Sequence, residues 1–295
     1  VFETGVVLGN PAQVTLIPGD TGGLSYGRCQ ATLAGGSLHA VVDHYVADPE
    51  ADPAHVAALT PYLDRLSARD AALNHDSPLA AALRRAGRDP AMARAQDAVF
   101  DAQYWQPACA AAGSLGVEDA LGRAVVFDSY VHGSWGHCRD LTDRAAGSIE
   151  AIGPRAWLEA YVRQRHDWLG THANPVLHAT VYRMQTFADL MAGAHWDLSP
   201  PVKVRGVTIA RQSVDPKAPR RVLRAERPWP QGLDVLTVQR TLTDQGHDLT
   251  PDGVYGPGTA GAVRALQARL GFKADGVVGD TTWAVIDRGA ENPIA

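Results

Sequence analysis

The chain has 295 residues, of which 45% are hydrophobic and 20% are charged, a composition typical of globular proteins. This length suits one large domain plus a small one. The formal net charge of -5 gives no electrostatic support for nucleic-acid binding. The sequence contains no apolar run of about 18 residues, so it predicts no membrane-spanning helix. The chain starts at Val1 without Met, so we expect a processed or trimmed form, and no cleavable signal segment is visible.

Cysteine and histidine spacing gives no sign of a metal centre. Cys29, Cys109 and Cys138 are too few and too widely separated for a disulfide scaffold or a zinc site. We expect free thiols, with a bridge between Cys109 and Cys138 as the alternative. The eleven histidines lack the paired spacing of zinc ligands. We therefore predict no metal centre. We also expect no cofactor and a monomeric protein.

The first stretch whose residues could take part in catalysis runs from Phe2 to Gln30. Glu3 follows an aromatic residue, and Asp20 stands in a run of glycines and hydroxyl residues. A carboxyl group in an apolar setting keeps its proton, whereas one among polar groups ionises. Two carboxyl groups in such different environments are the catalytic groups of a glycoside hydrolase. The alternative is that Gly19-Asp20-Thr21-Gly22-Gly23 is only a turn.

Most of the remaining chain to about residue 191 has helical periodicity. Several of these segments open with a capping residue followed by proline, as at Asp52-Pro53, Ser77-Pro78 and Asp89-Pro90. The predicted helices span residues 37–46, 54–73, 79–86, 91–112, 117–131, 154–169 and 175–191. Short connections between them predict a mostly α fold, with a short hairpin or edge strand near residues 200–209.

The last part of the chain contains an internal repeat. Asp252-Gly253-Val254-Tyr255-Gly256 and Asp275-Gly276-Val277-Val278-Gly279 are each followed three residues later by a threonine. Asp-Gly makes a tight turn, and threonine is a good helix cap. We predict helices at 235–245, 259–270 and 281–287, which form a module of about 60 residues preceded by a proline- and charge-rich linker.

This module resembles the bacterial peptidoglycan-binding domain of the first type. The matching features are the Val238-Gln239 pair, the two Asp-Gly-Val turns and the closing Thr281-Thr282-Trp283 segment. The resemblance implies that bacterial peptidoglycan is a partner of the protein. We predict a catalytic domain at 1–212, a linker at 213–228 and the binding module at 229–290.

The first 210 residues resemble the family 46 chitosanases and their muramidase relatives in the lysozyme superfamily. That family places a general-acid Glu about seventeen residues before a general-base Asp, and Glu3 and Asp20 fit this spacing. Ser25 stands where the family has a threonine that holds the attacking water. The resemblance implies a two-lobed helical fold and inverting hydrolysis of β-1,4 glycosidic bonds.

The same resemblance implies further residues around the reaction centre. Substrate contacts are expected from Gly22, Gly23, Tyr26, Arg28 and Gln30, with packing beneath the loop as the alternative for Tyr26. The segment from Phe127 to Gly133 resembles a family helix that ends in His-Gly and supplies a buried ion pair. Asp128 is therefore expected to pair with Arg165 or Arg183, and His132 to act as a cap or core hydrogen-bonder in support of the site.

Three functions fit these residues. The main prediction is a muramidase of a lysin or autolysin, because the segment Tyr26 to Gln30 is closer to that branch of the superfamily. A chitosanase with a wall-binding module is the alternative, and a wall-binding protein without catalysis is the third. All three act on the bacterial cell wall or outside the cell, reached by export or by phage delivery.

Overall fold

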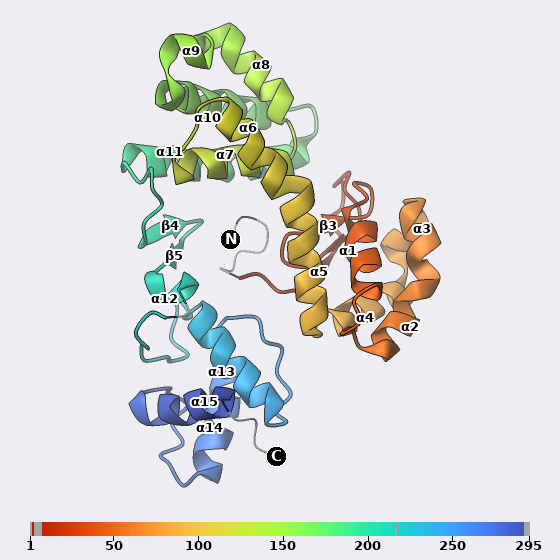
Figure 1. The fold of residues 1–295 in the computed structure, drawn as a ribbon, viewed down its shortest axis with the longest axis vertical. Helices are drawn as coiled ribbons and strands as arrows, with labels where there is room; N and C mark the ends of the chain where they lie inside the picture. The colour runs from red at the N-terminus through yellow and green to blue at the C-terminus, as the bar shows by residue number, and fades with distance from the viewer. Residues whose placement is uncertain (1, 3–7, 216, 292–295) are drawn as a thin grey trace. The chain divides into compact units, whose positions relative to one another are not determined.

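The structure is a computed structural model that describes residues 2, 8–215 and 217–291. It is mostly helical, as predicted, and Figure 1 labels its α-helices and three of its strands. Packing divides the described residues into two compact units. Unit 1 holds those up to Leu16, 22–96 and those from Gly206 onward, and unit 2 holds 17–21 and 97–205. None of the helices in the described ranges is long and apolar enough to cross a membrane.

Unit 1 opens with a small antiparallel sheet that the sequence did not predict. Its strands are β1 (Val14–Thr15), β2 (Ser25–Tyr26) and β3 (Ala31–Thr32), paired in that order. The register sets Val14 opposite Tyr26 and Ser25 opposite Thr32. Each strand has only two residues, which is too short for an alternating pattern to be visible in the sequence.

The helices that follow match the prediction except within 54–73, where the chain is interrupted twice. They are α1 (Ser37–Val46), α2 (Pro53–Leu59), η1 (Thr60–Tyr62), α3 (Leu63–Ser67), η2 (Ala71–His75) and α4 (Ser77–Ala86). The single helix expected at 54–73 is broken at Pro61, which cannot donate a backbone hydrogen bond within it, and again at Arg69, whose φ of 55° is left-handed. The core of this part is built from Leu24, Tyr26, Leu33, Leu38, Val41, Val42, Tyr45, Leu59, Leu66, Leu73, Leu79 and Leu83.

The helix predicted at 91–112 forms in three consecutive parts. These are α5 (Pro90–Phe100), the π-helical turn η3 (Asp101–Trp105) and α6 (Gln106–Ser114). Pro107 lies just after the wide turn, where its missing N–H and its ring conflict with the carbonyl of Gln103. A wider turn relieves that conflict, which explains why α5 and α6 are not one regular helix.

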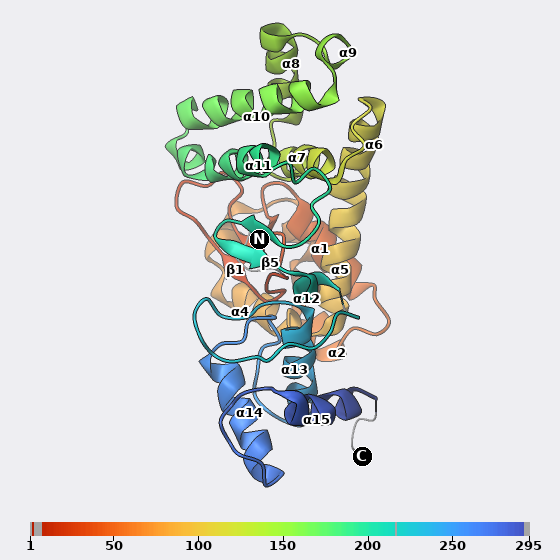
Figure 2. The ribbon, with the colours of Figure 1, turned by 90° about the vertical axis from the view of Figure 1, so that its left-hand side faces the viewer.

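Three helices form the centre of unit 2. They are α7 (Ala120–Val131), α10 (Pro154–Thr171) and α11 (Tyr182–Ala192), which pack against one another and lie close together in Figure 2. Two helices that the sequence did not predict, α8 (Trp135–Ala146) and α9 (Ile149–Ile152), lie against α10. No helical periodicity was visible in the sequence of α8, because the helix is mostly polar and only Cys138 and Thr142 are buried. The turn η4 (Pro175–Thr180) precedes α11, and β4 (Val202–Val204) pairs with β5 (Val207–Ile209).

The C-terminal module contains α13 (Leu233–Asp244), α14 (Pro257–Arg269) and α15 (Asp280–Glu291), which follow the short helix α12 (Arg211–Val214). Their buried side chains form one hydrophobic cluster. This cluster also includes Leu223, which lies within the predicted linker and forms an antiparallel bridge with Val278. Arg221 is fixed as well, because its guanidinium contacts Asp234 at 2.8 Å and its carbonyl accepts the Trp283 indole N–H at 2.8 Å. The folded module therefore begins before residue 229.

Candidate active site

A buried ionic network in unit 2 joins its three central helices. Asp128 on α7 accepts from Arg165 of α10 at 2.7 Å and from Arg183 of α11 at 2.5 Å. All three side chains are at least 95% buried, with exposures of 5%, 0% and 4%. The expected pairing of Asp128 is confirmed, and it involves both arginines rather than one.

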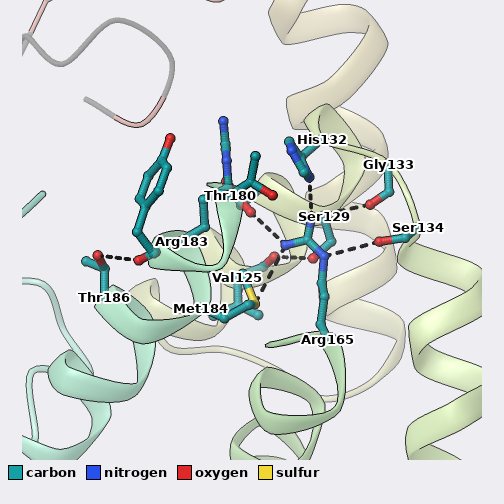
Figure 3. Close-up of polar contacts among 12 residues, drawn as sticks. Val125, Ser129, His132, Gly133, Ser134, Arg165, Thr180, Arg183, Met184 and Thr186 are labelled. Atoms are coloured by element: carbon teal, nitrogen blue, oxygen red, sulfur yellow. Dashed lines mark hydrogen bonds and ion pairs between the residues drawn. The ribbon is translucent and has the colours of Figure 1, made fainter. Parts of the chain in front are cut away.

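Arg165 is the centre of this network, as Figure 3 shows. Besides the carboxylate, its guanidinium contacts His132 Nδ1 at 3.2 Å, the Gly133 carbonyl at 3.3 Å and Ser134 Oγ at 3.2 Å. A buried guanidinium needs this many acceptors because each unsatisfied N–H would cost free energy. Arg165 therefore fixes the turn that ends α7, including Ser134 in its left-handed conformation with φ of 74°.

The network sets the protonation of its acid and of its imidazole. Burial alone would raise the pKa of Asp128, but the charges of Arg183 and Arg165 outweigh it, so the pKa lies below the usual range. Burial, assisted by Arg183 and Arg165, lowers the pKa of His132 to about 3. His132 is therefore neutral, and Nδ1 accepts from Arg165 because a guanidinium only donates. It is the cap of α7 and a core hydrogen-bonder, as predicted.

Asp20 closes a tight turn in unit 2. Its backbone N–H donates to the Ile17 carbonyl at 3.1 Å, with Pro18 and Gly19 at the central positions. Gly19 has φ of 81°, the left-handed conformation that the third position of a type II turn requires. A Cβ at Gly19 would lie 3.3 Å from Val176, so the turn is seated on η4. The turn leaves Asp20 half-buried.

The glycine loop that follows lies in unit 1 and is held by two amide side chains that the sequence analysis missed. Asn74 Oδ1 accepts from Leu24 N–H at 2.7 Å and fills the space beside Gly23. Gln96 of α5 donates to the Pro11 carbonyl at 2.8 Å and accepts from Arg28 N–H at 3.0 Å. Isolated amides on helices have no characteristic spacing, so neither residue could be recognised without the fold.

Several expected substrate contacts have internal partners in this loop. Gln30 donates to the Gly27 carbonyl at 2.8 Å, and the Arg28 guanidinium donates to the Ala93 carbonyl at 3.1 Å. Tyr26 is fully buried, and its hydroxyl donates to the Leu83 carbonyl at 2.8 Å. A buried ring cannot stack on a sugar, so the structure corrects the expected substrate role of Tyr26 in favour of packing beneath the loop.

The remaining expected site residues are distributed as follows. Ser25 lies on β2 with 6% exposure, and its hydroxyl donates to the Gly23 carbonyl at 3.2 Å. Gly22 and Gly23 are half-buried in the same loop. Asp20 and the ionic network belong to unit 2, whereas Ser25 and the glycines belong to unit 1. Glu3 lies outside the described residues.

Comparison with known families decides the class of the protein. Residues 14–202 match glycosyl hydrolase family 46. The chain belongs to that family. It is therefore a glycoside hydrolase, and residues 231–286 match a peptidoglycan binding domain, in agreement with both resemblances seen in the sequence.

Individual relatives support this assignment. A chitosanase of Bacillus subtilis strain 168 is 28% identical over 204 residues, which cover 63% of this chain and 72% of that protein. The crystal structure of a chitosanase from Bacillus subtilis MY002 is 25% identical with a TM-score of 0.60, covering 69% of this chain and 89% of that one. A Gynuella sunshinyii chitosanase structure shares the fold at 22% identity and a TM-score of 0.60, covering 69% of this chain and 89% of that one.

No disulfide joins Cys29, Cys109 and Cys138; Cys138 is buried and the other two are half-buried. In the described parts of the chain, no three side chains of His, Cys, Asp or Glu gather into a possible metal site.

Proposed function

We propose that this family 46 enzyme hydrolyses β-1,4 glycosidic bonds in a glucosamine polymer of the chitosan type. The observation that carries the proposal is the family match over residues 14–202, together with relatives that are named chitosanases. One such relative was solved in complex with six glucosamine units. A net charge of -5 also favours the approach of a polycationic substrate. These findings favour the chitosanase alternative over the muramidase that the sequence had suggested first.

The proposed reaction proceeds with inversion. Glu3 donates a proton to the leaving oxygen, and Asp20 accepts a proton from the water that attacks the opposite face of the sugar. Such a pair needs about 6.5 to 9.5 Å between its carboxyl groups so that the water fits. Asp20 suits the base role because its turn leaves the residue only half-buried.

Ser25 is proposed to position the attacking water. Its hydroxyl hydrogen is used in the bond to the Gly23 carbonyl, so its oxygen has lone pairs left to accept a hydrogen bond from water. The exposed edges of Gly22, Gly23, Arg28 and Gln30 are proposed to line the substrate path. Their internal hydrogen bonds hold the loop in one conformation before the substrate arrives, which reduces the entropy lost on binding.

The ionic network is proposed to support the site rather than to take part in proton transfer. Asp128 is fully paired and His132 is neutral, so neither group has a proton to exchange near neutral pH. By joining α7, α10 and α11, the network fixes the helical framework of unit 2, to which the turn of Asp20 is attached through Val176. Such supporting residues hold the catalytic groups in position to within fractions of an ångström.

Peptidoglycan is a second candidate substrate because residues 231–286 match a peptidoglycan binding domain. A wall-binding module would hold the enzyme at the bacterial cell wall and raise its local concentration there. The same module would also serve a chitosanase as a tether, so its presence does not decide which bond is cleaved.

Product analysis tests the proposal. The parent, Glu3→Gln, Asp20→Asn and the exposed control Asp43→Asn on α1 are incubated with chitosan and with purified peptidoglycan. We expect glucosamine reducing ends from chitosan, released first as the α-anomer, and a loss of about 10²- to 10⁴-fold in each of the two carboxylate variants but not in the control. Muramic acid reducing ends would instead establish a muramidase. Full turnover in Asp20→Asn would overturn the assignment of the base.

A further inference from the structure

The two Asp-Gly turns of the C-terminal module are built around the same side-chain network. In the first copy, Gln239 Nε2 donates to Asp252 at 2.8 Å and to Thr259 at 3.0 Å, and Gln239 Oε1 accepts from Gly253 N–H at 2.7 Å. The buried amide therefore ties the turn to the start of α14. Because Gln239 lies on α13, three segments of the module are joined by one side chain.

The second copy repeats these bonds atom for atom. Gln267 Nε2 donates to Asp275 at 3.3 Å and to Thr282 at 3.2 Å, while Gln267 Oε1 accepts from Gly276 N–H at 2.8 Å. The two turns thus present equivalent backbone surfaces. Gly256 in the first copy corresponds to Gly279 in the second, each lying three residues before the threonine.

The equivalent surfaces differ in what covers them. A Cβ at Gly256 would lie 3.7 Å from the Trp229 ring, so the indole of the preceding segment is seated on the first turn. Arg227 lies over that ring at 4.6 Å. At Gly279 no atom would approach such a Cβ within 4 Å. The first surface is therefore covered by a flat ring of this chain, and the second is open.

The open surface belongs to a groove of about 350 Å³, within the usual range for small-molecule sites. Its walls combine an aromatic ring with groups that bind hydroxyls and amides. Phe272 supplies the apolar surface, Asp275 and Asp280 supply carboxylates, and Lys273 and Thr281 supply donors. This combination suits a ring with an apolar face and polar edges, which describes a pyranose.

We propose that this groove binds an amino-sugar ring of the peptidoglycan glycan strand, in the place that Trp229 occupies on the first turn. The inference rests on the wall-anchoring part of the proposed function and adds the binding site and the moiety it recognises, the glycan rather than the stem peptide. The carboxylates accept hydrogen bonds from sugar hydroxyl and amide groups, and the C–H face of the ring packs over Gly279 and Phe272.

Sedimentation with purified peptidoglycan tests the site in the full chain carrying Asp20→Asn. Gly279→Gln fills the groove without a steric conflict at its Cβ, and Phe272→Ala removes the apolar wall. The matched control is Gly261→Gln on α14, where a Cβ is also free of contacts. We expect both groove variants to bind about tenfold more weakly and the control to bind like the parent, with a cooperative thermal unfolding transition retained by all three variants.

Two results would overturn the proposal. One is unchanged binding by both Gly279→Gln and Phe272→Ala. The other is loss of parent binding, measured by isothermal titration calorimetry, to the soluble glycan strands that remain after an amidase has removed the stem peptides, since the ligand would then be peptide. Binding is measured without turnover, so failure of this site and failure of the proposed hydrolysis give separate results.

Discussion

Removing the charge of Asp128 should destabilise unit 2 strongly. Asp128→Asn removes the carboxylate charge that lies between the buried guanidinium groups of Arg165 and Arg183, whose exposures are 0% and 4%. Breaking a buried pair in this way costs about 3 to 5 kcal/mol. A unit of this size loses roughly 3 °C in melting temperature for each kcal/mol, so we expect a decrease of about 10 to 15 °C.

Tryptophan fluorescence during urea or thermal unfolding measures this loss, because five of the seven tryptophans lie in unit 2, namely Trp105, Trp135, Trp157, Trp168 and Trp196. The matched control is Asp140→Asn, which removes an exposed pair with Arg139 and should cost less than about 1 kcal/mol. The lowered pKa of Asp128 means that its contribution is complete above the ordinary carboxyl range and is lost as the pH falls through the folded pKa. An Asp128→Asn variant within about 1 kcal/mol of the parent at pH 7 would refute the role given to the network.

Three further predictions concern stability. His132 stays neutral in the folded chain but takes up a proton when the chain unfolds. The unfolding free energy should therefore fall by about 1.4 kcal/mol per pH unit as the pH falls from about 6.5 to about 3. Urea unfolding of His132→Gln at several pH values should lack this part of the pH dependence, and an unchanged pH dependence would contradict the contribution assigned to His132. Leu223→Ala should destabilise the C-terminal module by about 2 to 5 kcal/mol in calorimetry. Val222→Ala, at a site that is 54% exposed, should change the unfolding free energy little. Equal effects of the two substitutions would place residue 223 outside the core. Asp89→Ala removes the acceptor of Tyr45 and of the Ala91 N–H at the start of α5, and should cost about 1 to 3 kcal/mol by urea unfolding; a neutral result would contradict that capping role.

Local signals in the sequence predicted most helices. The Asp-Pro and Ser-Pro starts lie at the observed beginnings of α2, α4 and α5 because proline has no N–H to lose in the first helical turn. The duplicated Asp-Gly turn likewise identified the helices of the C-terminal module. What these signals could not show was where a helix is interrupted, as at Pro61 and in the π-helical turn before Pro107. Such breaks depend on how the neighbouring turn accommodates the lost hydrogen bond.

Candidate site residues could be named from the sequence, but their surroundings could not. The spacing of Glu3 and Asp20 and the helix ending in His132-Gly133 were visible in the chain, and so was an expected partner for Asp128. That Asp128 binds two arginines at once follows only from the meeting of α7, α10 and α11. Tyr26 shows the same limit, because a tyrosine in a glycine loop suits a sugar or a core equally well until burial is known.

The sequence by itself therefore determined the helical class, the two families and the identity of the ionic residues, since capping, turn chemistry and motif spacing act over a few neighbouring positions. The tertiary structure decided which side chains are buried, which charges meet and which of two equivalent turns stays open. The physical reason is that burial and pairing depend on segments far apart in the chain. Gln96 fixes Arg28 across 68 positions, and Trp229 rather than a ligand covers Gly256, and neither contact has a local sequence signal.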